Sequence, residues 1–87
     1  MNGAATQIAS REFDAAFAVL PPRVQEMIQR KIDVMGLRLA IFPHYRMTGS
    51  DKYRLRIGDY RVIYRFNPAK AEIDLITIGH RREIYRD

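Results

Sequence analysis

Basic side chains alternate with apolar ones in residues 52–66, and this spacing is typical of a site for anions. The segment contains five lysines and arginines and a single acidic residue. Guanidinium groups bind phosphate and carboxylate oxygens through paired, charge-assisted hydrogen bonds. The segment therefore carries groups that could hold a phosphate or a carboxylate. Its basic residues are Lys52, Arg54, Arg56, Arg61 and Arg65.

The two halves of this segment are predicted to form a β-hairpin around a two-residue loop, Gly58-Asp59. A glycine at the first loop position suits the turns whose twist matches that of the strands. Counting outward from the loop pairs Arg56 with Arg61, and side chains alternate between the two faces of the hairpin. One face then carries the apolar set Tyr53, Leu55, Ile57, Tyr60, Val62 and Tyr64. The other carries Lys52, Arg54, Arg56, Arg61, Ile63 and Arg65.

The second face has two interpretations. Like charges that lie directly opposite each other destabilise a sheet by a few tenths to about 1 kcal/mol. A solvated face with side chains that splay apart would limit this cost. A face that binds an anion would instead give up local stability for function, as functional sites often do. The pairing of Arg56 with Arg61 makes the anion site the better hypothesis.

More candidate groups follow the next predicted strand, which we expect to end at Ile78. If this strand lies beside the hairpin, His80 or Arg81 reaches the rim of the basic face, and Tyr85 supplies an aromatic ring. Cleavage of RNA by its own 2′-hydroxyl needs a base, a proton donor to the 5′-oxygen and cations around the phosphorane. Positioning and charge could suffice for this chemistry without a metal. The chain lacks cysteine and its two histidines lie far apart in sequence, so we predict neither metal nor cofactor.

The N-terminal half is predicted to cover the apolar face of the hairpin. Residues 11–20 and 22–39 have the apolar spacing of two helices, and Ser10 suits the N-cap of the first. Prolines 21 and 22 separate the helices and leave a short turn, which makes an antiparallel helical hairpin. The stripes that would face the sheet are Phe13, Ala16, Phe17 and Leu20 in the first helix and Val24, Met27, Ile28, Ile32 and Met35 in the second.

The predicted sheet adds other strands to the hairpin. Residues 72–78 read as a central strand, residues 6–9 as a possible edge strand, and residues 83–86 as a last short strand or an extended tail. Residues 40–51 read as a connection, and Gly79 to Arg82 interrupts the strand pattern. We expect a single α+β domain over residues 1–87, with a helical hairpin packed on one face of a three- or four-stranded antiparallel sheet.

Composition narrows the functional classes. The chain is 47% hydrophobic, which suits a folded core, and nothing in it resembles a signal peptide or a membrane span. We expect a cytoplasmic protein with no membrane partner. The net charge is +5, and residues 44–87 contain ten lysines and arginines against six acidic residues. This basic half suits nucleic acid or an acidic protein partner.

Two C-terminal motifs carry a family resemblance. The run from Tyr53 to Tyr64, YRLRIGDYRVIY, together with Ile78 to Tyr85, IGHRREIY, resembles the RelE/ParE toxin superfamily, and the RelE-like branch in particular. The Leu20-Pro21 turn and Gly49 before the hairpin are also similar to that family. The resemblance implies a cytoplasmic toxin of a type II toxin–antitoxin system that cleaves messenger RNA in the ribosomal A site. It also implies neutralisation by an acidic antitoxin from an adjacent gene, and operator DNA as a partner of their complex.

The resemblance also implies catalytic roles. Arg61 matches a family arginine that holds the scissile phosphate, and Arg54 and Arg56 lie where the best-known members have lysines. Arg81 matches the proposed general acid, and Tyr85 a tyrosine that stacks on the substrate base. Lys52, Arg65 and Arg82 are expected to add substrate-binding charge. An arginine stays protonated and is a poor base, so either His80 takes that role or Arg56 only neutralises charge and cleavage is slow.

Two other functions remain open from the sequence. A ParE-like toxin on the same fold inhibits DNA gyrase by binding and needs no nuclease site. A catalytically weak relative would act with its antitoxin on operator DNA, and arginine at both lysine positions keeps that alternative open. Basic residues at the family's catalytic positions favour cleavage of messenger RNA.

Overall fold

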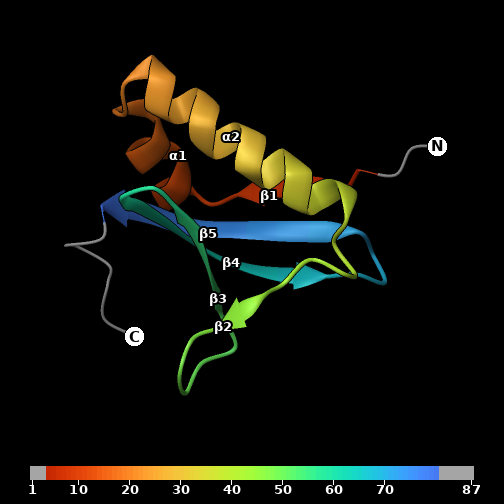
Figure 1. Ribbon diagram of the computed structural model, residues 1–87. Helices are drawn as coiled ribbons and strands as arrows, with labels where there is room; N and C mark the ends of the chain where they lie inside the picture. The colour runs from red at the N-terminus through yellow and green to blue at the C-terminus, as the bar shows by residue number, and fades with distance from the viewer. Residues whose placement is uncertain (1–3, 81–87) are drawn as a thin grey trace.

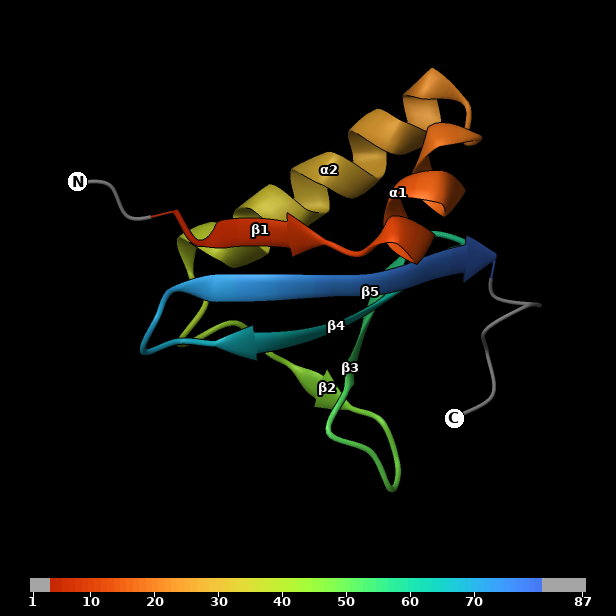
Figure 2. The ribbon, with the colours of Figure 1, turned by 180° about the vertical axis from the view of Figure 1, so that it is seen from behind.

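The computed structural model describes residues 4–80, which form a five-stranded sheet with two helices on one face (Figure 1). The strands are β1 (Thr6–Ala9), β2 (Tyr45–Arg46), β3 (Tyr53–Ile57), β4 (Tyr60–Asn67) and β5 (Glu72–His80). The helices are α1 (Arg11–Ala18) and α2 (Pro22–Leu37). Seen from behind, both helices still lie on the same side of the sheet (Figure 2). The α+β class and the N-terminal helical hairpin are confirmed.

The β3–β4 hairpin has the register that its sequence predicts. Arg56 lies opposite Arg61, Leu55 opposite Val62 and Ile57 opposite Tyr60. Gly58 opens the turn with a φ of +57°, a left-handed conformation that glycine adopts without the steric cost of a Cβ atom. The alternation of apolar and basic residues therefore places the arginines together on the face that the helices leave uncovered.

The remaining strands differ from the expectation of a three- or four-stranded antiparallel sheet. The order is β1-β5-β4-β3-β2, and β1 pairs parallel with β5, so the sheet has five strands and is mixed. The two-residue strand β2 falls in the segment expected to be a connection. It pairs only with the start of β3, so it has no strand pattern of its own in the sequence. Strand β5 also continues through Gly79 and His80 instead of ending at Ile78, because β4 extends far enough to pair with both. The predicted strand at 83–86 lies outside the described residues.

The first helix is fixed at its start by the predicted cap. The Oγ of Ser10 accepts a hydrogen bond from the backbone N–H of Phe13 at 3.0 Å and donates one to the carbonyl of Ile76 at 2.6 Å. The same side chain therefore begins α1 and ties it to β5. The second helix begins at Pro22 as expected and ends at Leu37, two residues earlier than the sequence pattern indicates.

The core fills the space between the helices and the apolar face of the sheet. From α2, Ile28, Ile32 and Met35 have no exposed surface, and from the sheet Val62 and Tyr64 have none. Burial of such side chains stabilises a fold by about 1.5–3 kcal/mol each relative to exposure, before the entropy of ordering is counted. Met27 was expected in this stripe but is 40% exposed. Neither α1 nor α2 is long and apolar enough to cross a membrane.

Candidate functional site

The centre of the candidate site is Arg61, and the structure buries it. Only 5% of this residue is exposed, although it lies on the sheet face without helices. One Nη atom donates to the carbonyl of Gly58 at 3.2 Å and to that of Tyr60 at 3.0 Å. The hairpin turn therefore holds this guanidinium in place. The alternative of a merely solvated side chain does not apply to Arg61.

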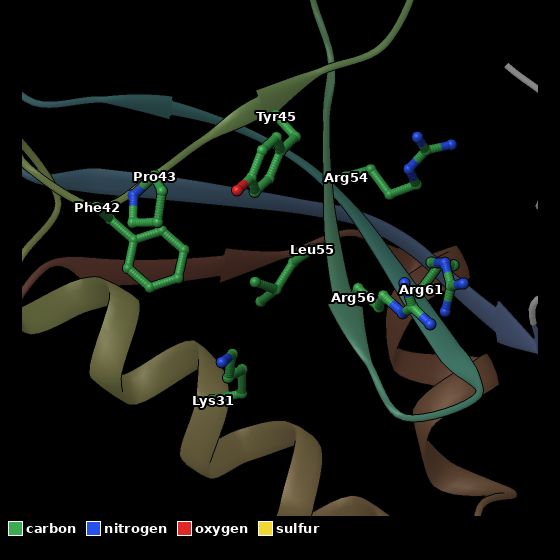
Figure 3. Close-up of a pocket in the computed structure, with 8 residues that line it drawn as sticks. All are labelled: Lys31, Phe42, Pro43, Tyr45, Arg54, Leu55, Arg56 and Arg61. Atoms are coloured by element: carbon green, nitrogen blue, oxygen red, sulfur yellow. The ribbon is translucent and has the colours of Figure 1, made fainter.

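A surface pocket of about 620 Å³ collects three of the predicted arginines. Arg54 is half-buried, Arg56 is exposed, and both line the pocket with Arg61. In Figure 3 the three arginines project from one side of the hairpin, whereas Leu55 points the other way. Their fixed positive charges suit an anion with several oxygens, because each guanidinium offers a planar set of N–H donors.

The pocket also has a second wall that the sequence did not reveal. Lys31 from α2 contributes another positive charge, and the segment before β2 contributes Phe42 and Pro43. Tyr45 of β2 adds an aromatic ring (Figure 3). The sequence analysis did not single out Lys31, and the others lie in the segment expected to be a connection. An aromatic residue next to a basic one, Tyr45-Arg46, is the sequence signal that could have suggested this wall.

A histidine outside the predicted site anchors this second wall. His44 donates from Nε2 to the carbonyl of Leu39 at 2.8 Å, so its Nδ1 accepts from the hydroxyl of Tyr64 at 2.5 Å. Its ring stacks on Phe66 with centroids 3.7 Å apart. Burial, with a smaller contribution from the nearby Tyr53, raises the pKa of Tyr64 above its ordinary value. The phenol therefore stays protonated and available as a donor to His44.

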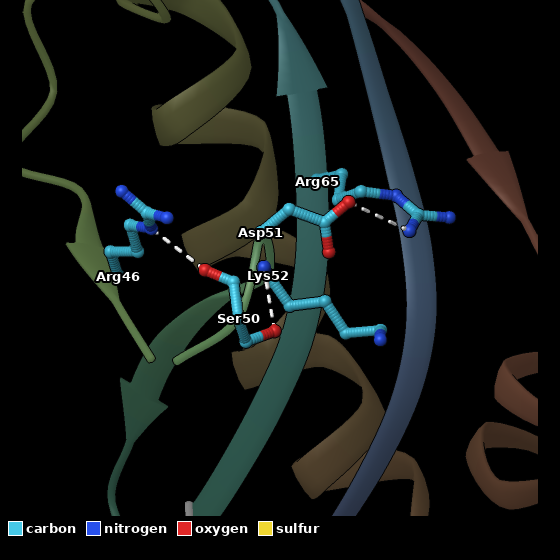
Figure 4. Close-up of polar contacts among 5 residues, drawn as sticks. All are labelled: Arg46, Ser50, Asp51, Lys52 and Arg65. Atoms are coloured by element: carbon cyan, nitrogen blue, oxygen red, sulfur yellow. Dashed lines mark hydrogen bonds and ion pairs between the residues drawn. The ribbon is translucent and has the colours of Figure 1, made fainter. Parts of the chain in front are cut away.

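Two other predicted substrate-binding residues lie outside the pocket lining. Arg65 forms an exposed ion pair with Asp51 at 3.4 Å, and the backbone N–H of Lys52 donates to the Oγ of Ser50 at 3.0 Å (Figure 4). In the same loop, Nε of Arg46 donates to the carbonyl of Ser50 at 2.7 Å. Neither residue lines the pocket, and Asp51 balances part of the charge of Arg65.

Of the other predicted catalytic residues, the structure describes only His80, which does not line the pocket. His80 or Arg81 was expected to reach the rim of the arginine face, and the register places His80 opposite Tyr60 on the helix-covered face. Its ring meets that of Tyr60 edge-on, with centroids 5.6 Å apart. Gly79 takes the place beside Arg61, and lacks a side chain there. Arg81, Arg82 and Tyr85 lie outside the described residues.

Among residues 4–80, no three histidine, aspartate or glutamate side chains gather to hold a metal ion. The arrangement in that part of the chain is an arginine-lined pocket on a rigid hairpin, with an aromatic wall. It can bind an anion and stabilise additional negative charge on it.

Comparison with known families identifies the chain. The family model described as ParE toxin of the type II toxin–antitoxin system parDE matches residues 5–85. This protein belongs to the ParE toxin family. It is accordingly a type II toxin within the wider RelE/ParE superfamily. No curated protein matches this toxin.

Solved structures share the fold of this toxin at low sequence identity. A chain of the toxin–antitoxin complex RelBE2 from Mycobacterium tuberculosis is 18% identical, with a TM-score of 0.75 over 93% of this chain and 95% of that one. A chain of the intact E. coli RelBE complex is 19% identical, with a TM-score of 0.75 over 88% and 96%. A chain of the archaeal RelE–RelB complex from Pyrococcus horikoshii is 24% identical, with a TM-score of 0.72 over 90% and 96%. These likenesses establish the RelE-like fold.

Proposed function

We propose that this toxin is a ribosome-dependent endoribonuclease that cleaves messenger RNA in the A site. The observation that supports this proposal most directly is the convergence of Arg54, Arg56 and Arg61 on one pocket. The third of these is buried and held by the turn, and its cross-strand neighbour carries the same charge. A fold under selection for stability alone has little reason to keep that pair. A phosphodiester bound in the pocket would explain why two arginines lie opposite each other.

The proposed reaction uses the RNA itself as nucleophile. The 2′-oxygen forms a bond to phosphorus, its proton leaves to a base, and the bond to the 5′-oxygen breaks as that oxygen takes up a proton. Arg61 would hold the phosphate, and Arg54 and Arg56 would balance the charge that grows on its oxygens. We assign proton donation to Arg81 and stacking on the base to Tyr85, as the family resemblance implies. Lys52, Arg65 and Arg82 would bind flanking phosphates.

The general base is the weakest part of this machinery. The three arginines stay protonated and are suited to charge stabilisation, not to proton removal. Histidine is the side chain that most often serves as a general base, but the His80 ring lies against Tyr60. We therefore expect slow cleavage, driven mainly by positioning and by charge.

The proposed partners follow from the charge of the site. The solved relatives include complexes of a toxin with its antitoxin. We propose that an acidic antitoxin from a neighbouring gene covers the arginine face and blocks RNA, and that the complex binds operator DNA. The site of action would be the cytoplasm, where ribosomes carry the substrate.

Induction of the toxin alone, followed by mapping of messenger RNA 5′ ends, tests the proposal. We expect cuts in phase with codons inside translated regions, and their loss in Arg61→Ala and Arg81→Ala. Arg30→Ala is the matched control, because Arg30 is exposed on α2 and does not line the pocket. Cuts that persist in both site variants would contradict the proposed roles.

A second candidate function is inhibition of DNA gyrase. It is favoured by the family model, which is that of the ParE toxin. Growth arrest with broken DNA and intact transcripts in the same experiment would establish it in place of RNA cleavage. An absence of arrest would leave the third alternative, a catalytically weak protein that acts with its antitoxin on operator DNA.

A further inference from the structure

Tyr45 differs from the three other tyrosines that the structure describes. It is 68% exposed, whereas Tyr64 is fully buried and Tyr53 and Tyr60 pack against the core. Within residues 4–80 its ring stacks on no other aromatic ring, and its hydroxyl makes no hydrogen bond. An exposed ring of this size has a face available for a ligand.

The position of Tyr45 ties it to the arginines. It lies directly opposite Arg54 across the β2–β3 pair, where Cβ atoms are about 5 Å apart. Both residues line the same pocket as Arg56 and Arg61. Figure 3 shows the ring between Pro43 and the strand that carries Arg54. An aromatic surface and a cluster of guanidinium groups therefore face one cavity.

The chain on both sides of Tyr45 is held in place. On one side, His44 is bonded to Tyr64 and Leu39 and stacks on Phe66. On the other, the Nε of Arg46 donates to the carbonyl of Ser50 at 2.7 Å. A ring mounted on fixed backbone loses little conformational entropy when a ligand stacks on it.

We propose that Tyr45 is a stacking platform for a nucleobase of the single-stranded RNA whose phosphate lies on the arginines. The inference rests on the proposed function. A nucleotide carries a phosphate and a flat base on different sides of its ribose. The pocket offers a partner for each, because it has guanidinium groups for the phosphate and an aromatic ring for the base. Proteins that bind single strands combine these two surfaces, because every base has a face that can stack. The carboxylates of an acidic peptide would use the arginines but do not need an aromatic ring beside them.

Binding of a short, end-labelled 2′-O-methyl RNA tests the platform, because this RNA cannot be cut. We expect Tyr45→Ala to weaken binding by about tenfold. Tyr45→Phe should bind within about twofold of the wild type, because it keeps the ring. Val19→Ala is the control, since Val19 is also highly exposed but lies at the end of α1, away from the pocket. On a chain of abasic ribose phosphates, Tyr45→Ala should bind like the wild type.

Several results would overturn the platform. These are an unchanged affinity for RNA in Tyr45→Ala, an equal loss on the abasic chain, and no binding of RNA by the wild type. A loss confined to an acidic peptide would assign Tyr45 to protein recognition instead. Single-turnover cleavage on programmed ribosomes separates this inference from the proposed function. If wild type and Tyr45→Ala cleave at equal rates at all toxin concentrations, Tyr45 is not a stacking platform and the nuclease function stands. If the wild type binds RNA through Tyr45 but does not cleave it, the platform stands and the nuclease function is wrong.

Discussion

At the scale of single residues, Arg61 is where the needs of folding and of function conflict. A charged side chain loses hydration when it is buried, and here its cross-strand neighbour Arg56 is also positive. The carbonyl groups of the turn offset part of that cost. The arrangement fixes the direction of the guanidinium before any ligand arrives, which is the property that stabilisation of a transition state requires.

We predict that Arg61→Met abolishes RNA cleavage and leaves the free energy of unfolding within about 1 kcal/mol of the wild type or above it. Methionine keeps most of the volume and removes the repulsion with Arg56. Urea unfolding and cleavage on ribosomes measure the two effects. Arg30→Met is the control, because Arg30 is exposed on α2 and does not line the pocket. A folded, active Arg61→Met protein would contradict the role assigned to this residue.

A second prediction at this scale concerns pH and Tyr64. Burial raises the pKa of its phenol, so the folded chain keeps the proton at pH values where the unfolded chain loses it. The stabilisation is therefore complete below about pH 10, the ordinary tyrosine pKa, and is lost as the pH rises further. Tyr64→Phe should flatten the fall in stability above about pH 10. It should also cost about 1 kcal/mol at neutral pH, through the lost bond to His44.

The test is chemical unfolding of both proteins across that range. Tyr45→Phe is the control, because Tyr45 is exposed and its hydroxyl bonds to nothing within residues 4–80. Equal slopes of stability against pH in Tyr64→Phe and the wild type would contradict the assignment.

At the scale of elements, the sequence predicts whatever has a strong local pattern. The period of two in residues 52–66 and the Gly58 turn determine the hairpin and its register, and the period of the helices determines which face is buried. Strand β2 has only two residues and no pattern of its own, so it exists only because β3 offers an edge. The direction of β1 is likewise set by its pairing with β5. The same limit applies to the site, because the arginines follow from the hairpin whereas Lys31 and Tyr45 reach the pocket only through tertiary packing.

Substitution of two glycines by alanine should change the stability of the fold in opposite directions. Gly58→Ala should destabilise the fold by about 1–2 kcal/mol, because φ is +57° at the turn and a Cβ atom is strained there. Gly36→Ala should stabilise it by about 0.5–1 kcal/mol. Gly36 lies in α2, and an added Cβ would meet Ala5 and Ile73 at ordinary contact distances of 3.6–3.8 Å. Thermal unfolding of the two variants measures both effects, and changes of the same sign would contradict this account of the backbone.

At the scale of the whole molecule, the fold separates two tasks between the faces of one sheet. The apolar face is buried under α1 and α2, and the opposite face holds the arginines at a hairpin whose register cannot slip without exposing the core. Four positive charges, those of Lys31, Arg54, Arg56 and Arg61, therefore gather at one pocket. The long-range electrostatic field of the protein would attract RNA wherever its positive charges lie. Direct contacts between side chains and phosphates depend instead on where each charge is placed.

The salt dependence of RNA binding separates these two effects. Each phosphate contact with single-stranded RNA contributes a slope of about −0.7 to the plot of log affinity against log salt concentration. The three arginines in the pocket should contribute about −2 to the slope for a non-cleavable RNA, and Arg56→Gln should reduce the magnitude of the slope by about 0.7. Arg30→Gln removes the same unit of charge from the exposed surface of α2 and should leave the slope unchanged. Equal effects of the two substitutions would mean that the overall charge attracts RNA and that the pocket makes no phosphate contact.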